Sequence, residues 1–471
     1  MNGSKTDLGT LGATELLRLY RRRDVSPVEA TKAAFERIGR FNEAVNAFCL
    51  IDEEGALAVA RASEERWMRG EPVGTLDGLP TTIKDLTVMA GTAMRRGSKT
   101  SDPDDISAVD APIAARMREA GAVFLGKTTT PEFGWKGVTD SPLTGITRNP
   151  WNVSRTSGGS SGGAAAAAAL NMGVLHQGSD AGGSIRIPAG FSGVFGHKPT
   201  FGFVPQWPTS AMGTLAHVGP ITRSVEDAAL MLTVVGKPDD RDWLSVPFER
   251  DWTVGLNSGV RGLRVAYSRT LGFIDVRPDV LKAVDAAVEA LADMGAHVEE
   301  VDPGITDSLD TFNVLWFSGA AKIIANMPEE KRGLVDPGLL AVAEEGAGID
   351  AVTYLRAVDD RGALANHMAA FHRDWDLLVT PTLPITAFEV GADVPAGSGL
   401  KHWMQWTPFS YPFDLTQQPA ATVPVGFGDD GLPVGLHVVA DRFRDDLVLR
   451  ASAAVESALP PVFPNAPQDG A

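Results

Sequence analysis

The chain has 471 residues, of which 44% are hydrophobic and 21% are charged, and its formal net charge at pH 7 is −17. This composition is ordinary for a soluble globular protein, and large α/β enzymes often hold such a length in a single core. The negative charge argues against nucleic acid and anionic membranes as partners, because both would repel an acidic surface.

The single cysteine, Cys49, excludes an internal disulfide and is typical of a reducing compartment. The N-terminus lacks the apolar core of a signal peptide, and no apolar stretch reaches the length of a membrane-spanning helix. We therefore expect a cytoplasmic protein.

The first part of the chain alternates helices with strands. The second helix opens with a capping box, Ser26-Pro27-Val28-Glu29, and the strand at 78–85 delivers Lys84 at its end. Because strands that alternate with helices form parallel sheets, the pattern predicts an α/β fold with a large, mostly parallel mixed sheet covered by helices on both faces. The expected elements are helices at 14–22, 26–41, 52–68 and 108–120, and strands at 46–51, 78–85 and 122–126.

The middle of the chain combines a long irregular segment with two glycine-flanked serines. Residues 128–157 are rich in Pro, Gly, Thr and Trp, and loops of this length inside compact domains are usually functional. Ser160 in GGSSGG stands 24 positions before Ser184 in DAGGSIR, and an alanine-rich helix is expected between them at 164–170. We interpret residues 156–200 as two tight loops that this helix holds apart, each presenting a hydroxyl.

The rest of the chain continues the α/β pattern around a second long loop. Residues 384–418 contain several large aromatic side chains and are predicted to form a substrate-pocket loop, whereas residues 236–261 are expected on the surface. We find no internal repeat and no clear linker, so residues 1–471 are expected to form a single domain. The expected elements are helices at 224–235, 278–294, 308–327, 350–375 and 445–459, and strands at 263–267, 297–301, 376–380, 421–425 and 433–439.

Either serine needs a base before it can act as a nucleophile. A serine hydroxyl reacts poorly until its proton is removed, and no Ser-His-Asp pattern is evident in the sequence. Lys84 can serve as the base if burial keeps its amine neutral, because desolvation lowers the pKa of a lysine. GGSSGG also fits the nucleophile elbow G-x-S-x-G, but that elbow requires a buried strand before it, and residues 152–157 are polar.

Several motifs together resemble the amidase signature family of serine amidohydrolases. The matching segments fall in order across most of the chain, with the lysine and the serines at family-like spacing, and residues 157–189 hold the signature core. The segments are GLPTTIKD (78–85), TPEFGW (130–135), NPWN (149–152), SGGSSGGAAAA (157–167), GSDAGGSIRIPA (178–189), GHKPTFGFVP (196–205), GPITRSVEDAALML (219–232), LLVTPTLP (377–384), and QPAATVPVGF and GLPVGLHV within 418–438.

The resemblance implies a Ser-cisSer-Lys triad that works without a metal or a cofactor. Ser184 would form the acyl-enzyme, and Ser160 would bridge it to neutral Lys84, with a cis peptide bond joining Gly159 to Ser160. Backbone amides near the nucleophile would bind the negatively charged oxygen that develops during attack. The amides expected at this oxyanion hole are those of Ala181, Gly182, Gly183 and Ser184.

Residues around the triad are expected to support it or to contact the substrate. Asp180 and Arg186 could touch substrate, but we expect them to orient the nucleophile loop through hydrogen bonds, with Ser161 as a further donor. Gln177 contacts either the substrate or the loop, and this alternative stays open. The eight histidines lack the spacing of a metal site. The expected substrate contacts are Phe133, Gly134, Gln177, Met212, Trp403 and Trp406, although large aromatic residues more often belong to a core.

Two positions depart from the family pattern. Gln417 stands where glycine is usual, and His437 stands where glutamine is common. Substrate contacts of a particular family member are therefore not carried over to this chain, whereas the triad is.

The leading hypothesis is a serine amidohydrolase that cleaves a small carboxamide or anilide, with esters and carbamates as further substrates because they form the same acyl-enzyme. The alternative is the A-type component of a glutamyl-tRNA amidotransferase, which would release ammonia from glutamine within a larger assembly. The aromatic residues of 403–411 favour an apolar substrate, and intact Lys84, Ser160 and Ser184 argue against an inactive scaffold. The expected partners are a small amide and, in a homodimer, a second copy of the chain, but neither nucleic acid nor a membrane.

Overall fold

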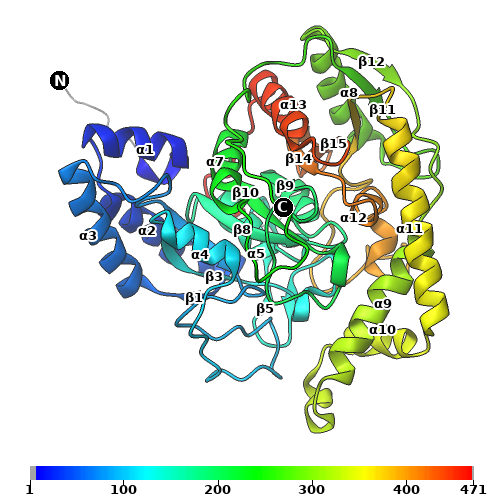
Figure 1. The fold of residues 1–471 in the computed structure, drawn as a ribbon, viewed down its shortest axis with the longest axis horizontal. Helices are drawn as coiled ribbons and strands as arrows, with labels where there is room; N and C mark the ends of the chain where they lie inside the picture. The colour runs from blue at the N-terminus through cyan, green and yellow to red at the C-terminus, as the bar shows by residue number, and fades with distance from the viewer. Residues whose placement is uncertain (1–6, 469–471) are drawn as a thin grey trace.

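A mixed β-sheet runs through the centre of the structure, a computed structural model that describes residues 7–468 (Figure 1). Within that range the sheet has eleven strands in the order β1-β3-β2-β8-β10-β9-β14-β15-β13-β11-β12. The strands are β1 (Phe48–Ile51), β2 (Pro80–Lys84), β3 (Val123–Thr128), β8 (Leu175–Asp180), β9 (Phe195–Lys198), β10 (His217–Thr222), β11 (Arg264–Tyr267), β12 (His297–Glu300), β13 (Leu377–Pro381), β14 (Ala420–Phe427) and β15 (Pro433–Val439), with short hairpin strands β4 (Asp140–Ser141), β5 (Gly145–Ile146), β6 (Arg148–Asn149) and β7 (Asn152–Thr156) outside it.

The predicted α/β fold with a mixed sheet is confirmed, but antiparallel pairing takes a larger share than the sequence suggested. Parallel pairs flank the centre, where β2 lies between β3 and β8 and β11 lies between β12 and β13. Strands from β8 through β10, β9, β14 and β15 to β13 pair antiparallel, as does β1 with β3. The strand–helix alternation therefore described the two flanks of the sheet and missed its antiparallel middle.

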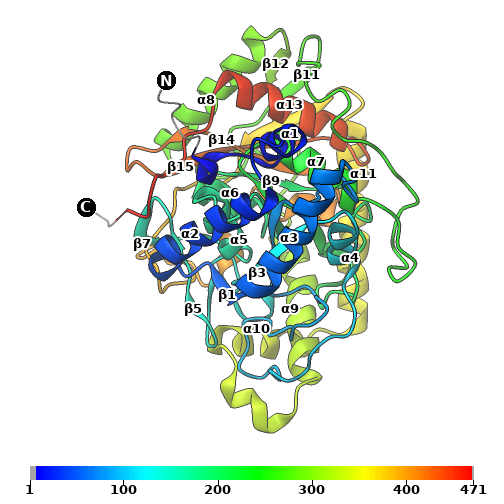
Figure 2. The same cartoon turned by 90° about the vertical axis from the view of Figure 1, so that its left-hand side faces the viewer.

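Helices cover both faces of the sheet (Figures 1 and 2). Alternate residues of β3 point to opposite faces, so Val123 and Leu125 pack with α2, α3 and α5 while Phe124 joins the cluster that contains α4 and α7. The helices are α1 (Ala13–Arg22), α2 (Pro27–Val45), α3 (Glu53–Arg69), α4 (Pro112–Glu119), α5 (Gly162–Ala169), α6 (Arg186–Ser192), α7 (Val225–Val235), α8 (Pro278–Asp293), α9 (Leu309–Ala325), α10 (Pro337–Ala347), α11 (Ala351–Phe371), α12 (Pro412–Leu415) and α13 (Asp445–Ala458).

Two predicted helix starts are formed by the expected side chains. The Ser26 hydroxyl accepts the Glu29 backbone N–H at the start of α2, and the Glu29 carboxylate accepts the Ser26 N–H in return. At α7, the Ser224 hydroxyl accepts the Asp227 N–H. Local sequence thus fixes where these helices begin.

Several elements near the serines were not expected from the sequence. The residues taken as two loops around one helix also form β8, α6 and β9, and the next segment forms β10. Proline usually excludes a segment from the middle of a sheet, yet Pro220 lies in β10 opposite Gln177 of β8. The polar sequence of β8 hid its strand character, because its side chains bond to the site rather than packing in an apolar core. Helix α10 was also missed.

A second core lies beside the sheet, where α9, α10 and α11 pack against the aromatic segment at 403–415. In both views α9 and α10 project from one corner of the molecule (Figures 1 and 2). This core contacts the loop that carries Ser184, because a Cβ added at Gly182 would lie 2.7 Å from the Phe312 ring and 3.0 Å from the Trp403 ring. Among the described helices, none combines the length and apolar character that crossing a membrane requires.

Candidate active site

Lys84 ends β2 and places its amine inside a cluster of serine hydroxyls. The side chain is fully buried, and Nζ lies 2.7 Å from Ser160 Oγ, 2.8 Å from Ser161 Oγ and 3.0 Å from Ser179 Oγ. Its backbone N–H donates to Gln177 Oε1 at 2.9 Å, which fixes the strand end to β8. Strand pairing and side-chain contacts therefore hold this amine in one place.

Burial gives the Lys84 amine the properties of a base. Removal from water lowers its pKa well below the ordinary value of 10.5, and the negative charge of Asp180 opposes this shift only in part. The three groups closest to Nζ are neutral hydroxyls, so no carboxylate pairs with the amine directly. A lowered pKa favours the neutral amine, which can accept a proton.

Ser160 lies on the turn between β7 and α5. The peptide bond from Gly159 to Ser160 is cis, as the family resemblance predicted. A Cβ at Gly159 would lie 2.6 Å from the Val138 carbonyl oxygen, so only glycine fits where the two backbones cross. The next residue, Ser161, directly precedes α5 and contacts Lys84 as predicted for a supporting side chain.

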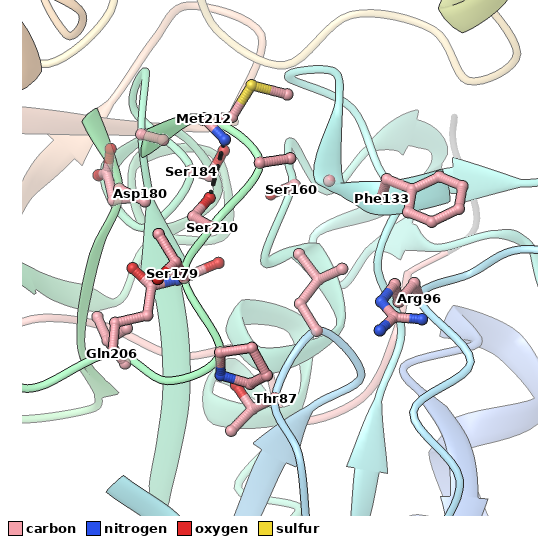
Figure 3. Close-up of a pocket in the computed structure, with 18 of the residues that line it drawn as sticks. Thr87, Arg96, Phe133, Ser160, Ser179, Asp180, Ser184, Gln206, Ser210 and Met212 are labelled. Atoms are coloured by element: carbon pink, nitrogen blue, oxygen red, sulfur yellow. Dashed lines mark hydrogen bonds between the residues drawn. The ribbon is translucent and has the colours of Figure 1, made fainter. Parts of the chain in front are cut away.

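Ser184 lies between β8 and α6 and lines the same pocket as Ser160 (Figure 3). Within residues 7–468 the Ser184 hydroxyl has no hydrogen-bond partner, and the predicted bond between the Ser160 and Ser184 hydroxyls is not formed. The backbone links the two loops, because the Ser161 N–H donates to the Ser184 carbonyl at 3.1 Å. The structure thus brings the three predicted catalytic residues to one site, with the Ser184 hydroxyl available to a bound molecule.

The predicted oxyanion hole requires one correction. The Gly183 N–H donates to Asp180 Oδ1 at 2.6 Å, so this amide is already occupied and is not available to a substrate oxygen. The amides of Ala181, Gly182 and Ser184 have no acceptor among the described residues, and Ala181 and Ser184 line the pocket. The sequence could not distinguish the occupied amide from its neighbours, because the distinction depends on where the Asp180 carboxylate points.

Asp180 and Arg186 form a buried ion pair that holds the nucleophile loop. Arg186 Nε lies 2.9 Å from Asp180 Oδ2, and its Nη2 lies 2.6 Å from Asp414 Oδ2. Burial would raise the pKa of Asp180, but the charge of Arg186 and its hydrogen bonds hold that pKa below the usual range. Asp180 also accepts the Ile185 N–H at 3.1 Å. The expected loop-orienting role of this pair is therefore the one that its contacts support.

The two departures from the family pattern have structural counterparts. Gln417 adopts a φ of 62°, in the left-handed region that glycine enters most easily. His437 Nε2 lies 3.2 Å from Arg186 Nη1, so this histidine contacts the ion pair and not the pocket. Neither residue touches the substrate space directly.

The pocket that holds both serines has a volume of about 170 Å³. Of the predicted substrate contacts, Phe133, Gly134 and Met212 line it. Its largest unpredicted part is the segment from Pro205 to Met212, in which the Trp207–Pro208 peptide bond is cis. The further lining residues are Leu86, Thr87, Met94, Arg96, Ala111, Ile113, Ser179, Asp180, Ala181, Ala216, Val218, Trp316 and Ile323.

The predictions for Gln177, Trp403 and Trp406 as substrate contacts are wrong. Gln177 is buried, accepts from the Lys84 N–H and the Thr87 hydroxyl, and donates to a backbone carbonyl, so it belongs to the loop structure. Trp403 lies in the second core, and the Trp406 ring stacks on Phe191 with centroids 5.7 Å apart. None of residues 384–418 lines this pocket, so the segment supports the nucleophile loop from behind and does not form a pocket wall.

Some functional candidates were missed by sequence reasoning. Ser179 contacts Lys84, and Arg96, Gln206 and Ser210 line the pocket. Ser179 directly precedes Asp180 in the GSDAGGS motif, and this position was the one available signal for it. The others lie in segments without a motif, and only the chain fold brings them to the serines.

Comparison with known proteins places this geometry in a family. The amidase family profile matches residues 29–449. The chain is 38% identical to an acylamidase of Rhodococcus erythropolis, with 97% of both chains covered. It is also 35% identical to the A-type component of the glutamyl-tRNA(Gln) amidotransferase of Acidothermus cellulolyticus, covering 96% of this chain and 95% of that one.

A solved structure agrees with both sequence comparisons. A bacterial aryl acylamidase of the amidase signature family superimposes with a TM-score of 0.89 at 31% identity, covering 96% of each chain. The profile match spans most of the chain, and the relatives cover nearly all of it. The chain therefore belongs to the amidase signature family and is an amide-bond hydrolase.

Proposed function

We propose that the protein cleaves small acyl amides or anilides through an acyl-enzyme on Ser184. The observation that carries this proposal is the buried Lys84 amine, which lies 2.7 Å from Ser160 Oγ behind a pocket that both serines line. A cytoplasmic location and a homodimer stay predictions made from the sequence.

The hydrogen bonds around Lys84 suggest the direction of proton transfer. Ser161 Oγ lies 3.2 Å from the Ser179 carbonyl, which can only accept, so the Ser161 proton is used there. Ser161 therefore accepts one N–H of the neutral Lys84 amine, and Ser179 Oγ accepts the other. The remaining lone pair of Nζ then faces Ser160 Oγ, which makes Lys84 a base toward Ser160.

Attack on the substrate follows from this arrangement. As Ser184 Oγ bonds to the amide carbon, its proton passes to Ser160, whose own proton passes to Lys84. The amides of Ala181, Gly182 and Ser184 would donate to the negatively charged oxygen. The protons then return along the same path to the leaving nitrogen as the C–N bond breaks. Water repeats the sequence and releases the acid.

The pocket favours a small substrate with apolar parts. A cavity of about 170 Å³ limits the substrate to a compact molecule, and its walls include Leu86, Ile113, Trp207 and Met212. Two similar proteins are an acylamidase and an aryl acylamidase, which agrees with an acyl amide or anilide as the substrate class.

Glutamine is the second candidate substrate, because one relative is the A-type component of an amidotransferase. Free glutamine carries an ammonium group that needs a carboxylate or other acceptors. Asp180 is the one acidic residue among the described lining residues, and both of its oxygens are bonded to Arg186. This occupied carboxylate favours the acylamidase assignment over glutamine hydrolysis.

A substrate panel tests the proposed function. The purified protein is expected to hydrolyse 4-nitroacetanilide and, faster, the more reactive ester 4-nitrophenyl acetate, while releasing little ammonia from glutamine. Release of 4-nitroaniline, 4-nitrophenol and ammonia is measured at equal substrate concentrations. Ammonia release from glutamine that exceeds anilide hydrolysis would reverse the assignment, and turnover of none of the three would contradict the proposed function.

A further inference from the structure

Arg96 places a positive charge in the pocket wall, beside Phe133 and away from Asp180 (Figure 3). Its side chain is half-buried, and within residues 7–468 its guanidinium group forms neither an ion pair nor a hydrogen bond. Burial lowers the pKa of Arg96, which records the absence of a direct partner, but an arginine remains charged at neutral pH. An arginine in such a position has donors that are available to a bound molecule.

The backbone of Arg96 is held by the two segments that flank the catalytic lysine and serine. Its N–H donates to the Asp85 carbonyl at 3.0 Å, directly after Lys84, and its carbonyl accepts the Phe133 N–H at 2.8 Å. The residue adopts a φ of 53°, which is uncommon for a side chain with a Cβ. Gly134, next to Phe133, leads to the triad, because a Cβ there would lie 3.3 Å from Ser160 Oγ. Arg96 is therefore fixed relative to the reacting groups.

The acidic groups near Arg96 do not neutralise it. Asp85 raises the pKa of Arg96 through space, but its carboxylate pairs with Lys127 at 2.8 Å. Asp105, the other acid that acts on Arg96, is exposed to solvent. Asp180, across the pocket, is engaged by Arg186. The guanidinium therefore faces the pocket as an uncompensated cation.

We propose that Arg96 determines substrate specificity by binding a carboxylate of the substrate, so that the preferred amides carry a carboxylate in addition to the scissile bond. This inference rests on the proposed function and names its substrate class. The planar guanidinium matches a carboxylate with two parallel hydrogen bonds. The small pocket requires that the carboxylate and the scissile carbonyl belong to one compact molecule.

Two pairs of matched substrates test this assignment and locate the carboxylate. The first pair places it in the acyl part, as 4-nitroanilides of succinic acid and of its neutral isostere 4-methylpentanoic acid. The second pair places it in the amine part, as butyryl amides of 4-aminobenzoate and of 4-nitroaniline, whose nitro group has the shape of a carboxylate. The ratio of kcat/KM within each pair is compared between protein variants, so intrinsic differences in reactivity cancel.

Arg96→Met is expected to lower the ratio of anionic to neutral substrate by about 10-fold to 100-fold in at least one pair, the effect of losing hydrogen bonds to a charged group. Arg96→Lys keeps the charge but loses the planar fork, so it is expected to give an intermediate ratio, and it supplies the same test if Arg96→Met does not fold. Arg21→Met removes an equal charge from the exposed surface of α1 and is expected to keep the wild-type ratio.

The outcomes separate this proposal from the proposed function. If the wild-type protein hydrolyses these amides and the ratios in both pairs are unchanged by Arg96→Met and Arg96→Lys, the carboxylate assignment is overturned and the amidase function stands. If the wild-type protein hydrolyses no member of either pair, the proposed function fails, and the specificity proposal fails with it. A decreased ratio in one pair supports the proposal and states which half of the substrate carries the carboxylate.

Discussion

Replacement of Ser184 by alanine is expected to lower kcat for an anilide by about 10⁴-fold or more, because no acyl-enzyme can form without the attacking oxygen. The same change is expected to leave the thermal midpoint nearly unchanged. The Ser184 hydroxyl has no hydrogen-bond partner within residues 7–468, so its removal breaks no interaction of the folded protein. Steady-state kinetics and a thermal melt on the same preparation measure both effects.

A matched control separates loss of the nucleophile from loss of a serine. Ser63 is a buried serine of α3 whose hydroxyl also has no partner among the described residues, and it does not line the pocket. Ser63→Ala is expected to keep the wild-type kcat. Turnover by Ser184→Ala within about tenfold of the wild type would remove Ser184 as the nucleophile, the factor being small beside the loss that triad deletions cause.

Replacement of Lys84 by methionine is the second change with a large expected effect. Methionine has a similar length but no lone pair on nitrogen, so kcat is expected to fall by about 10²-fold to 10⁴-fold, the usual contribution of a general base. Lys84→Arg supplies a permanent positive charge that cannot accept a proton. It is expected to be as inactive as Lys84→Met, and substantial activity in either variant would contradict the role of Lys84 as a base.

The pH dependence follows from the lowered pKa of Lys84. The neutral amine is the active form, so wild-type kcat/KM is expected to be constant above the lowered pKa and to fall as pH decreases through it. A kcat/KM that is flat at every acidic pH at which the fold persists would contradict this assignment. The profile is measured with a neutral anilide, so that substrate ionisation does not contribute.

Folding stability gives an independent check of the same group. Between the lowered pKa and 10.5, the unfolded chain holds a proton on Lys84 that the folded protein lacks. The contribution of this residue to the free energy of unfolding therefore rises with pH across that interval and is lost as pH falls through it. Urea unfolding at several pH values is expected to show a weaker rise in Lys84→Met than in the wild type.

The sequence predicted the catalytic residues better than the space around them. Lys84, Ser160 and Ser184 stand in motifs whose glycines and strand ends have local causes, so their neighbourhood could be inferred before any coordinates. The helix starts at Ser26 and Ser224 likewise depend on residues three positions away. Features of this kind need no knowledge of distant parts of the chain.

The pocket could not be predicted because it depends on distant contacts. Trp403 and Trp406 are as large and apolar as pocket residues, and only the packing of α9 and Phe191 against them assigns them to the core. Arg96 is an ordinary arginine in the sequence, and its place in the pocket wall arises from hydrogen bonds to two separate segments. The Gly183 amide is similar, because its occupation depends on the Asp180 carboxylate.

Mass spectrometry of the acid-quenched protein during turnover of 4-nitrophenyl acetate tests the central claim most directly. The account predicts a transient acetyl group on the peptide that contains Ser184, and its absence from Ser184→Ala. An acetyl group that accumulates on Ser160 or another residue at the rate of turnover, or rapid turnover without any acylated protein when deacylation is slowed at low pH, would contradict it.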